Sequence, residues 1–182
     1  MKLADIGLDA AIRSLLPHFV AAGRLACRIQ DDIKKNGQRN GESKGGERFV
    51  DVVTDADIAI ETYLGTVLLT TYEDVAFYGE EYERDRISAY FPKEAPYLVT
   101  LDPVDGTLYF KDGLPLFCTI LTICANDAIE AAVVYVPREE RFYWAVRGQG
   151  AWTTTAADVA AGIAPVPYRV PTGGKVMLVG MS

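Results

Sequence analysis

One strand that ends in two carboxylates restricts this chain's fold more than any other feature. Residues 97–99 (YLV) predict a strand, which runs directly into the segment 101–107 (LDPVDGT). Pro103 fixes its own φ and restricts Asp102, while Gly106 accepts backbone angles that other residues avoid. We therefore expect a tight turn in which both carboxylates and the hydroxyl behind them converge on one point.

The residue types in this turn favour a divalent metal ion. Close acidic groups such as Asp102 and Asp105 repel each other and resist joint ionisation unless a cation lies between them. Ligands that are all oxygen suit Mg²⁺, with Mn²⁺ as the second choice. Asp-Pro and Asp-Gly are also common turn-forming pairs, so the segment taken alone is equally compatible with a plain turn.

An acidic segment upstream strengthens the metal interpretation. Residues 51–57 (DVVTDAD) begin with a β-branched run that is typical of a strand, and the apolar spacing afterwards predicts a helix from about Asp55 to Thr71. Thr54 or Asp55 can cap that helix, where negative charge suits the helix dipole. Asp57 lies about half a turn further on and is therefore the candidate for a site.

A second acidic segment follows a short apolar strand. Residues 75–81 (VAFYGEE) predict a strand that ends at Gly79, with two carboxylates directly behind it. Glu81 leads into a charged stretch that fits a solvated loop. Glu80 comes directly after the strand end and is the better candidate for a ligand.

These three segments together resemble the inositol monophosphatase family of the Mg²⁺-dependent, lithium-sensitive phosphatase superfamily. The likeness rests on Asp-x-Val-Thr-x-x-Asp, Gly-Glu-Glu and Asp-Pro-Val-Asp-Gly-Thr in this order, and it covers essentially the whole chain. It implies Mg²⁺-dependent hydrolysis of a small phosphate monoester, by default inositol monophosphate, through attack by a metal-activated water. The alternatives are a phosphatase of the same superfamily acting on 3′-phosphoadenosine 5′-phosphate or a sugar bisphosphate, and a non-catalytic metal-binding fragment.

The resemblance also implies a role for each candidate residue. The implied metal ligands are Glu80, Asp102, the carbonyl of Val104, Asp105 and Asp57. The implied catalytic residues are Glu80 and Thr107, which hold the attacking water, and Asp57. The implied substrate-binding residues are Asp105, Gly106, Thr107 and Lys44, although Lys44 lies further from the first acidic segment than is usual. Gly106 and Thr107 open the short helix that receives the phosphate.

Composition limits the partners that we expect. The formal net charge of −7 argues against a nucleic-acid-binding surface, and bound metal ions can still reverse the local field for an anionic substrate. We find no apolar run of membrane-spanning length and no secretory leader. Three cysteines without a Cys-x-x-Cys pair indicate buried free thiols in a cytoplasmic protein. We expect no nucleic-acid or membrane partner, while the resemblance implies a small phosphorylated metabolite as partner and a homodimer.

The order of the predicted elements indicates an α+β fold. Residues 8–35 are helical in pattern, and residues 36–48 predict a loop that the resemblance implies to be a lid. Beyond residue 107, predicted strands at 117–125, 128–136 and 141–146 alternate with turns, the first of them at Asn126-Asp127. We expect two N-terminal helices on a mainly antiparallel sheet, the first half of the layered sugar-phosphatase fold. Residues 1–182 should form a single catalytic-type domain, with the family's C-terminal α/β domain absent.

Overall fold

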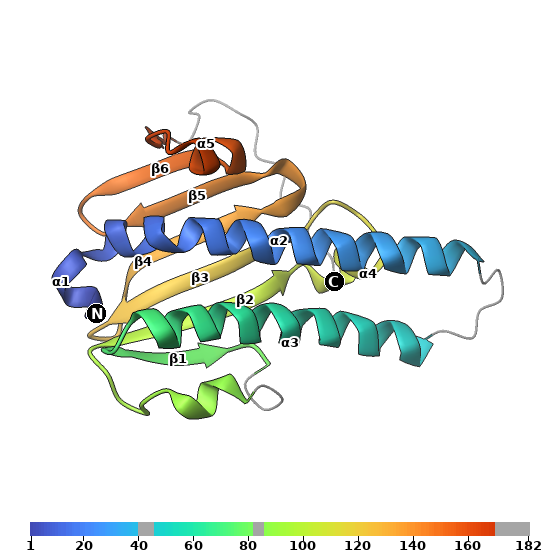
Figure 1. Cartoon of the computed structure of the whole chain (residues 1–182), viewed down its shortest axis with the longest axis horizontal. Coiled ribbons are helices and arrows are strands. Elements are labelled where there is room, and N and C mark those ends of the chain that lie inside the picture. Colours follow the sequence, from blue (N-terminus) through green and yellow to red (C-terminus); the bar gives the residue numbers. More distant parts are fainter. Residues whose placement is uncertain (40–45, 82–85, 170–182) are drawn as a thin grey trace.

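Seven strands form one sheet whose spatial order follows the chain (Figure 1). The computed structural model describes residues 1–39, 46–81 and 86–169. The strands are β1 (Val75–Gly79), β2 (Tyr97–Asp105), β3 (Cys118–Ala125), β4 (Ala128–Val136), β5 (Arg141–Val146), β6 (Gly150–Thr155) and β7 (Val166–Pro167). Only the β1–β2 pair is parallel among these strands, and each later pair is antiparallel.

Two long helices lie side by side across one face of this sheet (Figure 1). The helical elements are α1 (Leu3–Ile6), α2 (Leu8–Arg39), α3 (Gly46–Thr71), η1 (Ile87–Tyr90), α4 (Thr107–Lys111), η2 (Pro137–Glu139) and α5 (Ala156–Ala161). Helix α2 continues through Pro17 although proline removes a backbone donor. Buried apolar residues on both sides of it, such as Leu16 and Phe19, hold the helix against the sheet.

The core lies between these helices and the sheet. Phe142 stacks on Tyr135 at a centroid distance of 4.1 Å and meets Phe19 of α2 edge-on at 6.4 Å. A Cβ at Gly23 would lie 2.4 Å from the Tyr135 ring, so glycine permits α2 to approach β4 closely here. The predicted α+β fold, with two helices on a mainly antiparallel sheet, is confirmed.

The predicted strand at residues 51–54 is wrong, because these residues belong to α3. Thr54 and Asp55 consequently lie inside the helix and do not cap it. A β-branched residue costs a helix only a few tenths of a kcal/mol, roughly. That cost is small beside the burial of Ala56, Ile60 and Leu64, which recur at helical spacing.

The loop predicted at residues 36–48 is wrong at both of its ends. Residues 36–39 extend α2, and residues 46–48 belong to α3. The rest of the predicted lid, including Lys44, lies outside the described residues. The turn predicted at Asn126-Asp127 is confirmed, with φ values of 50° and 58° that match the twist of a two-residue hairpin.

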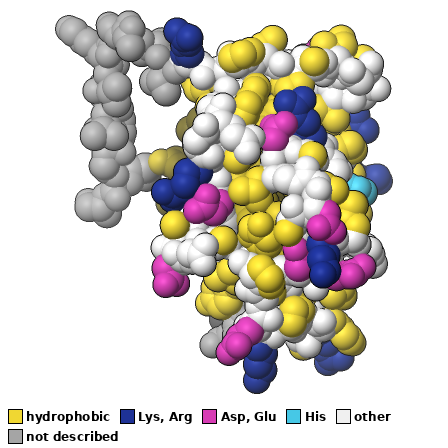
Figure 2. Space-filling view, turned by 90° about the vertical axis from the view of Figure 1, so that its left-hand side faces the viewer, with side chains coloured by type: hydrophobic (Ala, Val, Ile, Leu, Met, Phe, Trp, Pro, Cys, Tyr) yellow, Lys and Arg dark blue, Asp and Glu magenta, His cyan; other side chains and the backbone are white. Residues whose placement is uncertain are grey.

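Charges of both signs are distributed over the end of the molecule shown in Figure 2. Lys and Arg side chains are scattered there among Asp and Glu side chains rather than gathered into one basic patch. In the described ranges, none of the helices combines the length and apolar composition needed to cross a membrane.

Candidate metal and phosphate site

The parallel pairing of β1 with β2 brings two of the predicted ligands together. Gly79 pairs with Leu101, and the Glu80 N–H donates to the Leu101 carbonyl at 3.0 Å. Glu80 therefore leaves the sheet beside Asp102, and the two carboxyls lie within hydrogen-bonding reach of each other. Two carboxyls in such contact need either a shared proton or a cation.

A bulge in β2 redirects the chain directly after Asp102. Asp102 pairs with Ile120 and Asp105 with Cys118, so the two residues between them face Thr119 alone. One of these two is Pro103, which has no N–H for the ladder and is therefore tolerated at a bulge. The Thr119 hydroxyl donates to the Pro103 carbonyl at 2.8 Å, so this backbone acceptor has a hydrogen-bond partner at the bulge.

The turn into α4 requires glycine. Gly106 has a φ of 92°, and a Cβ there would lie 2.6 Å from the Leu116 carbonyl oxygen. The following hydroxyl, Thr107 Oγ1, donates to the Val104 carbonyl at 3.0 Å. The structure thus places the Thr107 hydroxyl and the predicted carbonyl ligand of Val104 in direct contact.

Helix α3 supplies a buried carboxyl to the same region. Asp57 is 3% exposed, and its Oδ1 has no hydrogen-bond partner among the described residues. Burial raises the pKa of Asp57 to about 8, and the negative charges of Glu80, Glu81 and Asp102 add to the rise. Asp57 therefore belongs electrostatically with Glu80, Glu81 and Asp102.

Glu61 is a member of this group that the sequence analysis missed. It is fully buried, one helical turn beyond Asp57, and its Oε2 accepts a hydrogen bond from the Glu81 N–H at 3.1 Å. Gly79 lies so close that a Cβ there would be 2.0 Å from the Glu61 carboxyl carbon. The spacing of four residues from Asp57 was the available signal, since it places both carboxyls on one helix face.

The donor set fits a divalent metal ion. Asp57 Oδ1 and Asp102 Oδ1 are both buried, and neither accepts a hydrogen bond within the described ranges. Burial and the neighbouring Glu80 charge raise the pKa of Asp102 to about 7. A hard cation would remove both penalties, because it compensates the buried charge and coordinates the unsatisfied oxygens.

The carboxylates do not yet converge on one point. In the part of the chain that the structure describes, no three His, Cys, Asp or Glu side chains are arranged to hold one ion. Metal binding therefore requires a side-chain rotation, and Glu80 and Asp105 are the members of the group that are exposed and can turn. Asp105 currently accepts a hydrogen bond from the Cys118 thiol at 3.4 Å.

Cys118 contributes to the rim of this site as a thiol. Burial raises the pKa of Cys118 to about 12, and the adjacent Asp105 carboxylate adds to the rise. All three cysteines are free, as predicted, but the prediction that they are buried is wrong, because each is only partly buried. A thiol with so high a pKa is a poor metal ligand and nucleophile, so oxygen ligands dominate the site.

The raised carboxyl pKa values predict how the metal-free protein responds to pH. Because Asp57 and Asp102 bind protons more tightly when folded than at their ordinary pKa of 3.8, their stabilising contribution is complete at low pH. It is lost progressively as the pH rises from about 4 to about 8, the range between the ordinary and the raised pKa values. We expect the melting temperature of chelator-treated protein to fall between pH 5 and pH 8, and Mg²⁺ to flatten this dependence. Asp57→Asn should reduce the slope, and an unchanged slope in that variant would contradict the assignment.

Comparisons with known proteins show the family to which this chain belongs. The inositol monophosphatase family model matches residues 14–170, so the chain belongs to the inositol monophosphatase family. Inositol monophosphatase from Dictyostelium discoideum is 36% identical over 150 residues, which are 82% of this chain and 52% of that protein. Nus factor SuhB from Haemophilus influenzae is 31% identical over 136 residues, which are 74% of this chain and 49% of that protein.

Solved structures show the same fold. The extragenic suppressor protein suhB from Bartonella henselae superposes with a TM-score of 0.60 at 23% identity, over 80% of this chain and 52% of that one. CysQ from Bacteroides thetaiotaomicron gives a TM-score of 0.59 at 22% identity, over 81% of this chain and 49% of that one. The chain spans about half the length of these two curated relatives.

Proposed function

We propose that this chain carries the metal site of a Mg²⁺-dependent phosphatase that hydrolyses a small phosphate monoester. The observation that carries the proposal is the pair of buried, unsatisfied oxygens on Asp57 and Asp102, which lie beside Glu80. Inositol monophosphate is the default substrate, because the Dictyostelium relative is named for that activity. Residues 1–182 form a single domain in this proposal.

The residues present suggest a division of labour. Glu80, Asp102, Asp105, Asp57 and the Val104 carbonyl would hold divalent ions. Such ions lower the pKa of a bound water and compensate the charge on phosphoryl oxygens. Glu80 and the Thr107 hydroxyl would orient the attacking water. Backbone N–H groups from Gly106 onward would receive the phosphoryl oxygens, together with Lys44.

Thr107→Ala is expected to separate water positioning from metal binding. Loss of the hydroxyl should lower turnover by roughly 100-fold, a common effect of a group that handles the reacting proton. The affinity for Mn²⁺ should stay within a few fold, because no carboxylate is removed. Phosphate-release assays and calorimetric Mn²⁺ titrations would measure the two effects. Thr107→Ser keeps the hydroxyl and serves as the control, so equal losses in both variants would count against the assigned role.

The function itself is tested by phosphate release in the presence of Mg²⁺. Inositol 1-phosphate and 3′-phosphoadenosine 5′-phosphate are assayed in parallel, with Asp105→Asn as the inactive control. A sugar bisphosphate belongs in the panel, because a 27% identical relative from Aquifex aeolicus is named as both a fructose-1,6-bisphosphatase and an inositol-1-monophosphatase. Release that Asp105→Asn abolishes supports the proposal. Metal binding without release from any substrate would favour a metal-binding fragment instead. Lithium inhibition, homodimerisation and a cytoplasmic location stay predictions.

A further inference from the structure

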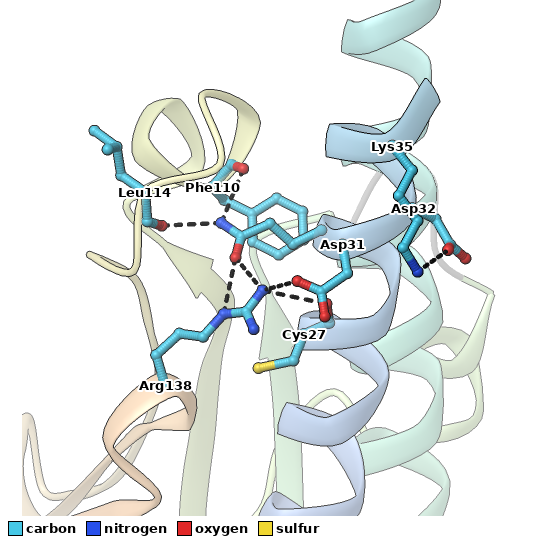
Figure 3. Close-up of polar contacts among 8 residues, drawn as sticks. Cys27, Asp31, Asp32, Lys35, Phe110, Leu114 and Arg138 are labelled. Atoms are coloured by element: carbon cyan, nitrogen blue, oxygen red, sulfur yellow. Dashed lines mark hydrogen bonds and ion pairs between the residues drawn. The ribbon is translucent and has the colours of Figure 1, made fainter. Parts of the chain in front are cut away.

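Gln30 of α2 is buried where three elements meet, and its side chain uses its full hydrogen-bonding capacity. The residue is 0% exposed. Its Nε2 donates to the Phe110 carbonyl at 3.0 Å and to the Leu114 carbonyl at 2.9 Å (Figure 3). Its Oε1 accepts hydrogen bonds from Arg138 of η2, with the Nε of Arg138 at 2.9 Å.

The amide of Gln30 can have only one orientation. A guanidinium donates but cannot accept, so the Gln30 oxygen must face Arg138. Backbone carbonyls accept but cannot donate, so the amide nitrogen must face Phe110 and Leu114. Gln30 therefore accepts hydrogen bonds from Arg138 on one side and donates hydrogen bonds to two backbone carbonyls on the other. Neither an ionised glutamate nor an aliphatic residue can do both.

Arg138 is itself held in place. Its Nη2 donates to Asp31 Oδ1 at 2.6 Å and to the Cys27 carbonyl at 3.3 Å (Figure 3). This hydrogen bond from Arg138 holds the pKa of Asp31 below its ordinary value. Arg138 also forms part of the wall of a surface cavity of about 600 Å³ between α2 and η2, so solvent reaches the outer side of the network.

The tethered carbonyls belong to the end of α4. This helix has five residues, too few to be stable alone, and its last carbonyls accept hydrogen bonds from the N–H groups of the turn that follows. The Phe110 carbonyl accepts from the Gly113 N–H at 3.0 Å, and Gln30 adds a second hydrogen bond to the same oxygen from α2. Phe110 itself is fully buried and meets Phe117 edge-on at 4.9 Å. The other end of α4 begins at Thr107, about one helical turn away.

We propose that Gln30 is a positioning residue for the phosphatase site: it fixes α4 so that Gly106 and Thr107 keep their place beside the carboxylates of β2. This inference rests on the proposed function. Gln30 touches none of the predicted ligands and acts only through Phe110 and Leu114. The ion pair between Arg138 and Asp31 holds Gln30 in the orientation that this requires.

The test uses Gln30→Met in the full chain, because methionine keeps the length of the side chain and removes all of its strong hydrogen bonds. Amide hydrogen exchange is measured first, since α4 and the turn after it contain the protected amides of Phe110, Asp112 and Leu114. We expect these three amides to exchange about tenfold faster in the variant, while the amides of β3 and β4 keep their protection. Equal acceleration throughout the sheet, or no acceleration in α4, would overturn the inference.

A control variant removes a different anchor of α2, the helix that carries Gln30. Asp9 Oδ1 accepts from the indole N–H of Trp144 at 3.0 Å and ties α2 to β5, away from α4. Asp9→Ala should lower the melting temperature without a selective effect on the amides of residues 107–114. If Asp9→Ala loosened α4 as much as Gln30→Met does, Gln30 would have only a general structural role.

Measurements of turnover then test the positioning role of Gln30 separately from the proposed phosphatase activity. If wild-type chain releases phosphate, Gln30→Met should lower kcat by about 10- to 100-fold, since displacement by about 1 Å has effects of this size. Its Mn²⁺ affinity should be unchanged within a few fold. Retained kcat in the variant would overturn the positioning role and leave the function intact. Absence of release in the wild-type chain would be seen before any variant is compared and would count against the proposed function.

Discussion

Asp102→Asn is expected to abolish turnover while raising the stability of the metal-free protein. The wild-type carboxyl is held beside Glu80 with one buried oxygen unsatisfied, and burial raises its pKa to about 7. An amide at this position removes a buried negative charge that repels its neighbours, so the melting temperature without metal should increase at pH 8. The same change removes a predicted metal ligand, and metal-dependent stabilisation should disappear.

Asp127→Asn is the matched control for this prediction. It makes the same change in charge at the tip of the β3–β4 hairpin, where the φ of 58° suits asparagine. Thermal melts at pH 8 with chelator and with Mg²⁺, together with phosphate-release assays, compare the two variants. If Asp102→Asn destabilised the metal-free protein or kept its Mg²⁺-dependent shift, Asp102 would not be a metal ligand whose buried charge destabilises the metal-free protein.

Gly106→Ala should damage both stability and turnover. A Cβ would lie 2.6 Å from the Leu116 carbonyl oxygen, which is backbone and cannot turn away, and the φ of 92° is unfavourable for alanine. Left-handed strain costs roughly 1–3 kcal/mol, and the clash adds to it, so we expect an unfolding free energy lower by about 3 kcal/mol. Because relief of the clash must displace Thr107, turnover should fall by at least about tenfold.

Gly148→Ala separates the clash from the strain. Gly148 also has a positive φ, 72°, yet no described atom lies within 4 Å of its Cβ position. This control should lose only about 1 kcal/mol and keep full turnover. Urea denaturation and phosphate release measure both effects. Losses of equal size in the two variants would show that close packing at Gly106 has no special importance.

Local chemistry explains which parts of the fold could be predicted. Asn126-Asp127 needs only two adjacent residues that tolerate positive φ, and the strands on either side of it follow from their apolar runs. The backbone at Gly106 is similarly local, because its positive φ favours glycine, whereas residues 102–105 continue β2 through a bulge instead of forming the expected tight turn. The proximity of Glu80 and Asp102 was implied only by the family resemblance, and it depends on the parallel pairing of β1 with β2.

Tertiary contacts explain what the sequence analysis missed. Strand propensity at residues 51–54 competes with a helix whose later turns are buried, and packing decides in favour of the helix. In the sequence, Glu61 cannot be distinguished from an ordinary surface glutamate. Only the folded structure shows that it is enclosed, because its carboxyl packs directly against Gly79. Gln30 and Arg138 are separated by 108 residues, a distance over which no periodic pattern carries information.

Anomalous diffraction from a crystal grown with Mn²⁺ would test the central claim most directly. The claim is that Glu80, Asp102 and Asp105, with Asp57 behind them, form a divalent metal site. We expect anomalous density about 2.0–2.3 Å from carboxylate oxygens of Glu80 and Asp102, with Asp105 turned away from Cys118 toward the ion. Density elsewhere on the molecule, or none at this cluster at millimolar Mn²⁺, would contradict the account.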